Sequence, residues 1–206
     1  MKRIYFLFFI INLIIGFQSY SADNNIDETI KKIITSISPD NSIEANISLT
    51  APGLEYPSKG VIKLQGNMTH IIMPDFIMWY DGTTMWAYSE ATGEVNITSP
   101  SVDELITISP YAALNNYKPI FDIKEEKSAK KLLLIPKDTK SIPLKNIILH
   151  IDNANNYITK IEVSNINGEK QTIMINNYKK RNKLPESAFR FNTTDVPQGT
   201  PVIDLR

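Results

Sequence analysis

Short runs of alternating apolar and polar residues follow one another along most of this chain. From Ser42 to Leu49 almost every second residue is apolar, which is the pattern of a β-strand with one buried face. Further strands are expected at 60–66, 68–73, 76–80, 84–89, 94–98, 120–125, 131–136, 144–152, 157–164 and 170–178. Parallel pairing needs crossovers of a dozen residues or more, so strands this close together must be mostly antiparallel.

Two segments have the spacing of a helix instead. Asn25 to Ser38 carries a single apolar stripe, made by Ile26, Ile30, Ile33, Ile34 and Ile37. A second, shorter helix is expected to start with Ser109 as its cap and Pro110 at its first position. Its apolar side is made by Tyr111, Leu114 and Tyr117.

These elements predict a fold that is mainly β with few helices, an α+β protein. A sheet of about ten to eleven meandering strands curves strongly and tends to close on itself. We therefore expect an incomplete antiparallel β-barrel whose open side is covered by the two amphipathic helices as a lid. The lid residues are expected to be Ile30, Ile33, Ile34, Ile37, Tyr111 and Leu114.

The first 21 residues read as a secretory signal peptide. Lys2 and Arg3 precede an almost wholly apolar run from Ile4 to Phe17, and small residues follow. The expected domains are thus a signal peptide at 1–21 and one half-barrel domain at 22–206. The chain contains no Cys, so a domain exported across the inner membrane into the periplasm must rest on its core rather than on disulfides. Its 22 basic residues equal its 22 acidic residues, which gives no indication of nucleic-acid binding.

An unusual density of Met and aromatic residues surrounds the hairpin predicted at Asp81-Gly82. Four of the six Met residues lie between Met68 and Met85, and both Trp residues lie in the hairpin. Buried aromatics most often only fill a core, whereas flexible Met side chains also suit a surface that accepts variable shapes. The candidate residues of a lipid-binding cavity are Met73, Phe76, Met78, Trp79, Met85, Trp86 and Tyr88.

No pattern in the sequence indicates an enzyme, a metal site or a cofactor. His70 and His150 have no second ligand at metal-binding spacing, so both are interpreted as ordinary strand residues. Gly-x-Ser-x-Gly and Gly-rich phosphate motifs do not occur. The basic run from Lys179 to Lys183 is interpreted as a solvated loop, with an acidic partner or anionic lipid headgroups as the alternative.

Several motifs resemble the periplasmic carrier of outer-membrane lipoproteins, LolA. The Asp-Gly-x-x-x-Trp-x-Tyr hairpin of that family is matched by Asp81, Gly82, Trp86 and Tyr88. Its Leu-Pro-x-x-x-Phe-x-Phe segment is matched by Leu184, Pro185, Phe189 and Phe191. The final "GTPVIDLR" resembles the divergent branch with a Val-Ile-Asp-Leu-Arg-like C-terminus.

The resemblance implies a periplasmic, monomeric chaperone that binds lipoprotein acyl chains in an apolar cavity and carries them from the inner to the outer membrane. The implied partners are acylated lipoproteins, an inner-membrane ABC-type release complex, and an outer-membrane receptor or the membrane itself. One departure concerns the lid, because the family arginine that helps to hold it closed is missing from "LQGNMTHIIMP". The alternative function is a lipid- or ligand-sensing half-barrel of an envelope-stress or surface-assembly system.

Overall fold

A computed structural model describes residues 20–206, so nearly all of the predicted signal peptide lies outside the described residues. The strands are β1 (Ser42–Thr50), β2 (Ser58–Gln65), β3 (Met68–Met73), β4 (Phe76–Tyr80), β5 (Met85–Ser89), β6 (Glu94–Thr98), β7 (Phe121–Glu126), β8 (Lys131–Pro136), β9 (Leu144–Ile151), β10 (Ile158–Asn165), β11 (Lys170–Arg181) and β12 (Val202–Asp204). The α-helices are α1 (Tyr20–Ser36), α2 (Val102–Ile108) and α3 (Pro110–Leu114). Short 3-10 turns lie at Lys127–Ala129, Glu186–Phe189 and Thr193–Asp195.

All twelve strands belong to one open sheet, in the order β12-β6-β5-β4-β3-β2-β1-β11-β10-β9-β8-β7. Every pairing is antiparallel except that of β12 with β6. The predicted mainly β, incomplete barrel is therefore confirmed, with twelve strands instead of ten or eleven. The sheet does not close, because β12 and β7 form its two free ends.

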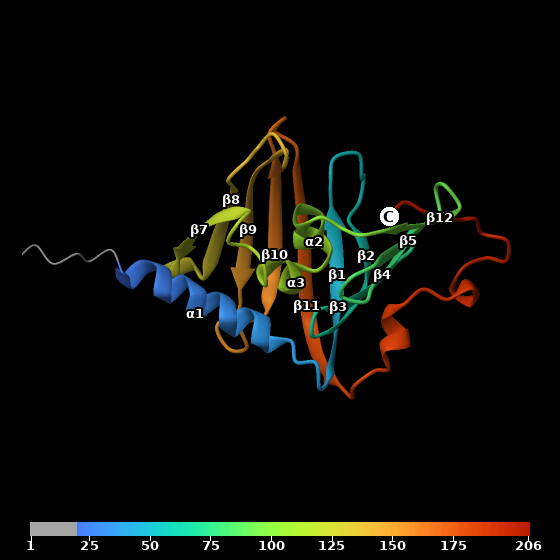
Figure 1. The fold of residues 1–206 in the computed structure, drawn as a ribbon, viewed down its shortest axis with the longest axis horizontal. Helices are drawn as coiled ribbons and strands as arrows, with labels where there is room; N and C mark the ends of the chain where they lie inside the picture. Colours follow the sequence, from blue (N-terminus) through green and yellow to red (C-terminus); the bar gives the residue numbers. More distant parts are fainter. Residues whose placement is uncertain (1–19) are drawn as a thin grey trace, which may run out of the picture.

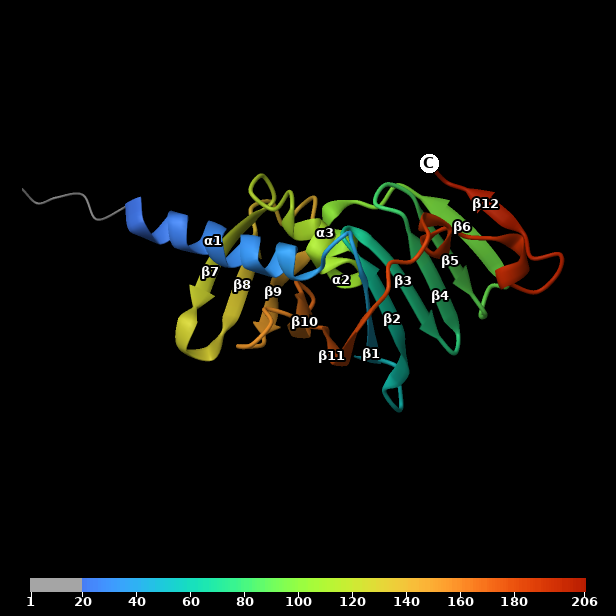
Figure 2. The same cartoon turned by 90° about the horizontal axis from the view of Figure 1, so that it is seen from below.

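The three α-helices lie together on one face of this sheet, which we call the helix face (Figures 1 and 2). In Figure 1, α1 crosses the half of the sheet made by β7 to β10, and α2 and α3 lie near the middle of the whole sheet. The segment after β11, residues 182–206, returns past β2 to β6 and ends in β12. We call this segment the C-terminal strap and the opposite side of the sheet the outer face.

One helix differs from the sequence-based expectation. The second predicted helix begins at Pro110 as expected, but α2 before it was not predicted. Its start is stabilised by Glu104, whose Oε2 accepts a hydrogen bond from the backbone N–H of Ser101 at 2.8 Å. Ser and Glu at this spacing are the signature of a capping box, so a start signal was present in the sequence.

The hairpin predicted at Asp81-Gly82 joins β4 to β5. Asp81 Oδ1 accepts hydrogen bonds from the backbone N–H groups of Thr83 and Thr84 at 3.0 and 2.9 Å. Gly82 has a φ of +101°, a value that a residue with a Cβ rarely adopts. The turn therefore depends on both residues of the Asp-Gly pair.

No helix in the described part of the chain is both long and apolar enough to cross a membrane.

Candidate functional site

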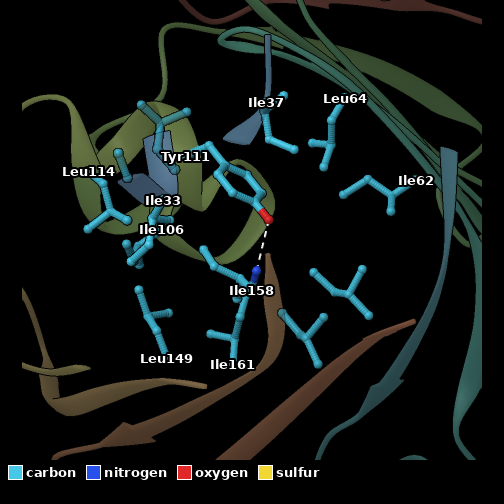
Figure 3. Close-up of a cluster of buried hydrophobic side chains, with 14 of the residues drawn as sticks. Ile33, Ile37, Ile62, Leu64, Ile106, Tyr111, Leu114, Leu149, Ile158 and Ile161 are labelled. Atoms are coloured by element: carbon cyan, nitrogen blue, oxygen red, sulfur yellow. Dashed lines mark hydrogen bonds between the residues drawn. The ribbon is translucent and has the colours of Figure 1, made fainter. Parts of the chain in front are cut away.

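The helix face of the sheet carries the main hydrophobic core. Inward-facing side chains of nearly every strand from β1 to β11 contribute to it, together with side chains of all three α-helices. Figure 3 shows its centre, where side chains from the helices point toward those of the strands. The labelled members are Ile33, Ile37, Ile62, Leu64, Ile106, Tyr111, Leu114, Leu149, Ile158 and Ile161. In this closed arrangement, side chains occupy the space beneath the helices.

The structure places the six predicted lid residues on this core. Ile30 and Ile33 of α1 and Ile37 directly after it are 3%, 0% and 2% exposed, and Ile34 is partly buried against the cluster. Tyr111 and Leu114 of α3 are each 1% exposed. The i, i+3, i+4, i+7 spacing of the isoleucines makes this possible, because it places them along one side of the helix.

Polar contacts also hold the helices to the sheet, and sequence reasoning missed them. Thr69 Oγ1 of β3 donates a hydrogen bond to Ser109 Oγ at 2.7 Å, and both residues are buried. Ser109 occupies the predicted cap position of α3, but its side chain makes no capping hydrogen bond with the helix. Asn115 adds a hydrogen bond of 2.8 Å from its amide nitrogen to Asn67 Oδ1 in the β2–β3 turn.

A second polar contact joins α3 to the end of β10. Pairing of β10 with β11 begins at Lys160, so the backbone of Ile158 lies beyond it. Two tyrosine hydroxyls make the hydrogen bonds to Ile158 that the backbone of a paired strand would otherwise make. Tyr111 Oη accepts from the Ile158 N–H at 2.9 Å, and Tyr178 Oη donates to the Ile158 carbonyl at 2.5 Å (Figure 3 draws the first bond).

Burial keeps both of these phenols neutral. It raises the pKa of Tyr111 to about 12, and it raises the pKa of Tyr178 well above 10. The two hydroxyl oxygens lie 3.4 Å apart, and Tyr157 stacks on Tyr178 with ring centroids 4.4 Å apart. A neutral hydroxyl can donate one hydrogen bond and also accept, which this network requires.

The predicted cavity residues divide between the two faces of the sheet. Met78 is fully buried in the helix-face core, and Met73, Phe76 and Met85 are partly buried against it. The other three, Trp79, Trp86 and Tyr88, lie on the outer face. Trp79 pairs directly with Trp86, and Tyr88 with Ile77, so alternation places all of them opposite Met78.

A smaller core on the outer face accommodates Trp79 under the C-terminal strap. Trp79 is 2% exposed, stacks on His70 at 5.3 Å and meets the edge of Phe191 at 5.5 Å. Phe189 of the strap is fully buried. Arg190 Nε forms an ion pair with Asp81 Oδ2 at 3.1 Å, which fixes the strap to the β4–β5 hairpin.

Two crevices flank α1 on the helix face. One, of about 340 Å³, lies at the C-terminal end of the helix beside Ile34, Ile37, Pro39 and Gly66. The other, of about 300 Å³, lies near its N-terminal end and includes Ile26, Asp27 and Phe121. The core beneath α1 therefore approaches the surface at both ends of the helix.

The fold and this site define a class of protein: a half-barrel whose apolar face is covered by helices. A family model described as outer membrane lipoprotein carrier protein LolA matches residues 20–168. The chain belongs to this family. No curated protein matches the chain in sequence.

Solved structures share the fold at low sequence identity. An uncharacterized conserved protein from Thermus thermophilus has a TM-score of 0.55 and 11% identity, over 87% of this chain and 99% of that chain. A LolA superfamily protein from Nitrosomonas europaea has a TM-score of 0.45 and 14% identity, over 80% and 97%. The MucA/MucB complex of Pseudomonas aeruginosa has a TM-score of 0.43 and 12% identity, over 82% of this chain and 62% of that chain. The first of these supports the half-barrel fold.

Proposed function

We propose that this protein is a periplasmic carrier that takes up the acyl chains of lipoproteins between its helices and its sheet. It would receive them from an inner-membrane ABC-type complex and deliver them to an outer-membrane receptor or to the membrane. The observation that carries this proposal is the continuous apolar helix face, which is closed by helices rather than by further strands. Membership of the lipoprotein carrier family supports the same reading.

The contacts of the helices suit a cover that opens. Burial of one Ile side chain contributes roughly 1.5–3 kcal/mol, so the α1 stripe is held by several kcal/mol in total. Acyl chains entering beneath α1 would replace these contacts with equally apolar ones. The Met and Phe side chains of β3 to β5 belong to the same helix-face core on the other half of the sheet, and flexible thioethers adapt to chains of different length.

A disulfide between α3 and the sheet tests whether the helices move. Thr69 Oγ1 and Ser109 Oγ lie 2.7 Å apart, so the double substitution Thr69→Cys and Ser109→Cys places two sulfurs within bonding reach. The chain has no other Cys. We expect the oxidised double variant to lose uptake of a fluorescent acylated peptide and the reduced form to regain it, because the ligand binds only the open population.

The two single Cys variants are the controls, since they alter the same buried site without a cross-link. Equal uptake by the oxidised and reduced double variant would show that uptake does not require α3 to move away from the sheet. The alternative sensing role predicts that the acylated peptide binds to the protein but is not transferred from it to outer-membrane vesicles. Mass spectrometry of molecules that co-purify with the native protein would identify the cargo.

A further inference from the structure

Two adjoining clefts lie on the outer face, where the C-terminal strap crosses the sheet. The first, of about 300 Å³, is lined by Ser42, Glu44, Lys63, Arg181 and Lys183, among others. The second, of about 470 Å³, extends from Lys63 over the neighbouring strands β3 and β4 to the strap. Because Lys63 lines both clefts, they adjoin at this residue, and we refer to the pair as one depression on the side of the sheet away from α1.

The first cleft is positively charged. It holds three cations, Lys63, Arg181 and Lys183, and one acid, Glu44. Arg181 Nη2 already binds Glu44 Oε1 at 3.0 Å. The hydrogen bond from Arg181 lowers the pKa of Glu44, with smaller contributions from Lys63 and Lys179. Among residues 20–206, Lys63 and Lys183 form no ion pair, so their charges are available to a ligand.

The second cleft combines an apolar patch with polar side chains around it. Trp79 and Ile77 line it, and Ile72 beside them is 37% exposed. His70 stacks on Trp79, and its buried Nδ1 has no hydrogen-bond partner in the described part of the chain. Asp195 is the one acid here, and its Oδ2 already accepts a hydrogen bond from the backbone N–H of Asn192 at 3.1 Å.

The strap is fixed where it borders the first cleft. The Gln65 side chain is fully buried and bonds to the backbone of Leu184 as a neighbouring strand would. Its Nε2 donates to the Leu184 carbonyl at 3.1 Å, and its Oε1 accepts from the Leu184 N–H at 2.9 Å. Walls that are already in place reduce the ordering cost of binding.

We propose that this depression binds a small anionic amphiphile, with its phosphate or carboxylate group between Lys63 and Lys183 and its apolar part over Ile72 and Ile77. A combined space of this kind falls in the range of roughly 300–1,000 Å³ found for small-molecule sites. The site is separate from the space beneath the helices, since it lies on the other face of the sheet. It therefore does not depend on the carrier function.

Hexyl phosphate is a suitable probe, and the two His residues of the chain report where it binds. His70 lies in the second cleft, whereas His150 pairs with Glu162 on β10 and serves as an internal reference. We expect NMR titration with hexyl phosphate to shift the His70 ring signals and to leave those of His150 unchanged. A bound anion also offsets the charge of Lys63, so it should raise the pKa of His70.

Lys63→Gln should weaken hexyl phosphate binding about tenfold, the loss expected for one charge-assisted hydrogen bond. Lys59→Gln is the matched control. It removes the same charge from the same face of the same strand, and at roughly 13 Å along β2 it lies beyond the Debye length of about 8 Å at physiological salt. Lys59→Gln should therefore bind as the unaltered protein does.

The ligand series separates the sources of affinity. Inorganic phosphate and the neutral hexyl glucoside should each bind at least tenfold more weakly than hexyl phosphate, because each fills only one cleft. Equal binding of inorganic phosphate and hexyl phosphate would overturn the amphiphile site. His70 signals that do not move at saturation would overturn it as well. A short poly-glutamate peptide that competes more strongly than hexyl phosphate would also overturn it, because such competition would indicate an acidic protein partner.

Discussion

At the scale of single residues, the closing contacts combine apolar burial with a few buried hydroxyls. The family arginine expected between β2 and β3 is missing, and Thr69 in that region bonds to the helix pair instead. Tyr111 of α3 likewise joins a helix to the sheet, because its hydroxyl accepts a hydrogen bond from the backbone N–H of Ile158 in β10. Such contacts depend on the meeting of residues that are 40 to 47 positions apart in the chain, so no local pattern predicts them.

Tyr111→Phe should lower the free energy of unfolding by about 1–3 kcal/mol, because it leaves the buried N–H of Ile158 without its acceptor. The same change should speed uptake of an acylated probe, since α3 loses a contact with the sheet. Urea unfolding and stopped-flow fluorescence measure the two effects. Tyr157→Phe is the control, because the Tyr157 hydroxyl makes no hydrogen bond with another described residue, and its effect should be much smaller.

His70 should make stability depend on pH. Burial, followed by the charge of Lys63, lowers its pKa from 6.5 to about 4, while Asp195 and the Ala188 backbone act in the opposite direction. The unfolded chain thus binds this proton first, and the stability present above pH 6.5 is lost as pH falls toward 4. His70→Gln should flatten this slope, which is at most about 1.4 kcal/mol per pH unit for one proton. An unchanged slope in urea unfolding between pH 6.5 and 4 would contradict the assignment.

At the scale of elements, the eleven strands from β1 to β11 were predicted, most of them because alternation reports a half-buried strand directly. The three residues of β12 are too few for such a pattern. The helix α2 was missed because Val102, Ile106, Thr107 and Ile108 are β-branched and weaken the helical signal.

Alternation also shows that Trp86 and Tyr88 share a face of the sheet, but it does not show which face. Since the strap covers the outer face, both faces of β4 and β5 carry apolar residues.

Phe189→Ala in the strap should lower the free energy of unfolding by about 3–5 kcal/mol, as for other fully buried Phe residues. Both Trp residues lie on the face that the strap covers, so their fluorescence emission should also shift to the red. Leu205→Ala, at a strap residue that is 62% exposed, should change neither quantity measurably. A stable Phe189→Ala variant with unshifted emission would show that the strap is dispensable to the outer core.

At the scale of the whole molecule, a cover that opens requires helices less stable than the sheet beneath them. We expect amide hydrogens of α1 and α3 to exchange through an opening that costs less free energy than global unfolding. The central strands β1 and β11 should exchange only through global unfolding. Hydrogen exchange followed by NMR tests this difference, and equal protection of α1 and β1 would argue against a movable cover.

The position of β1 beside β11 has a consequence for how the chain folds. Strands β1 to β6 form one run of sequence neighbours and β7 to β11 another, and the two runs meet only where β1 pairs with β11. That seam joins Ser42 to Arg181, whereas the other antiparallel pairs are local. Loop closure over such a distance is slow, so we expect two independently formed meanders and a late joining step. During synthesis the first meander forms before β11 exists, so the backbone N–H and C=O groups along one edge of β1 stay unpaired. At this stage the chain is most prone to aggregation.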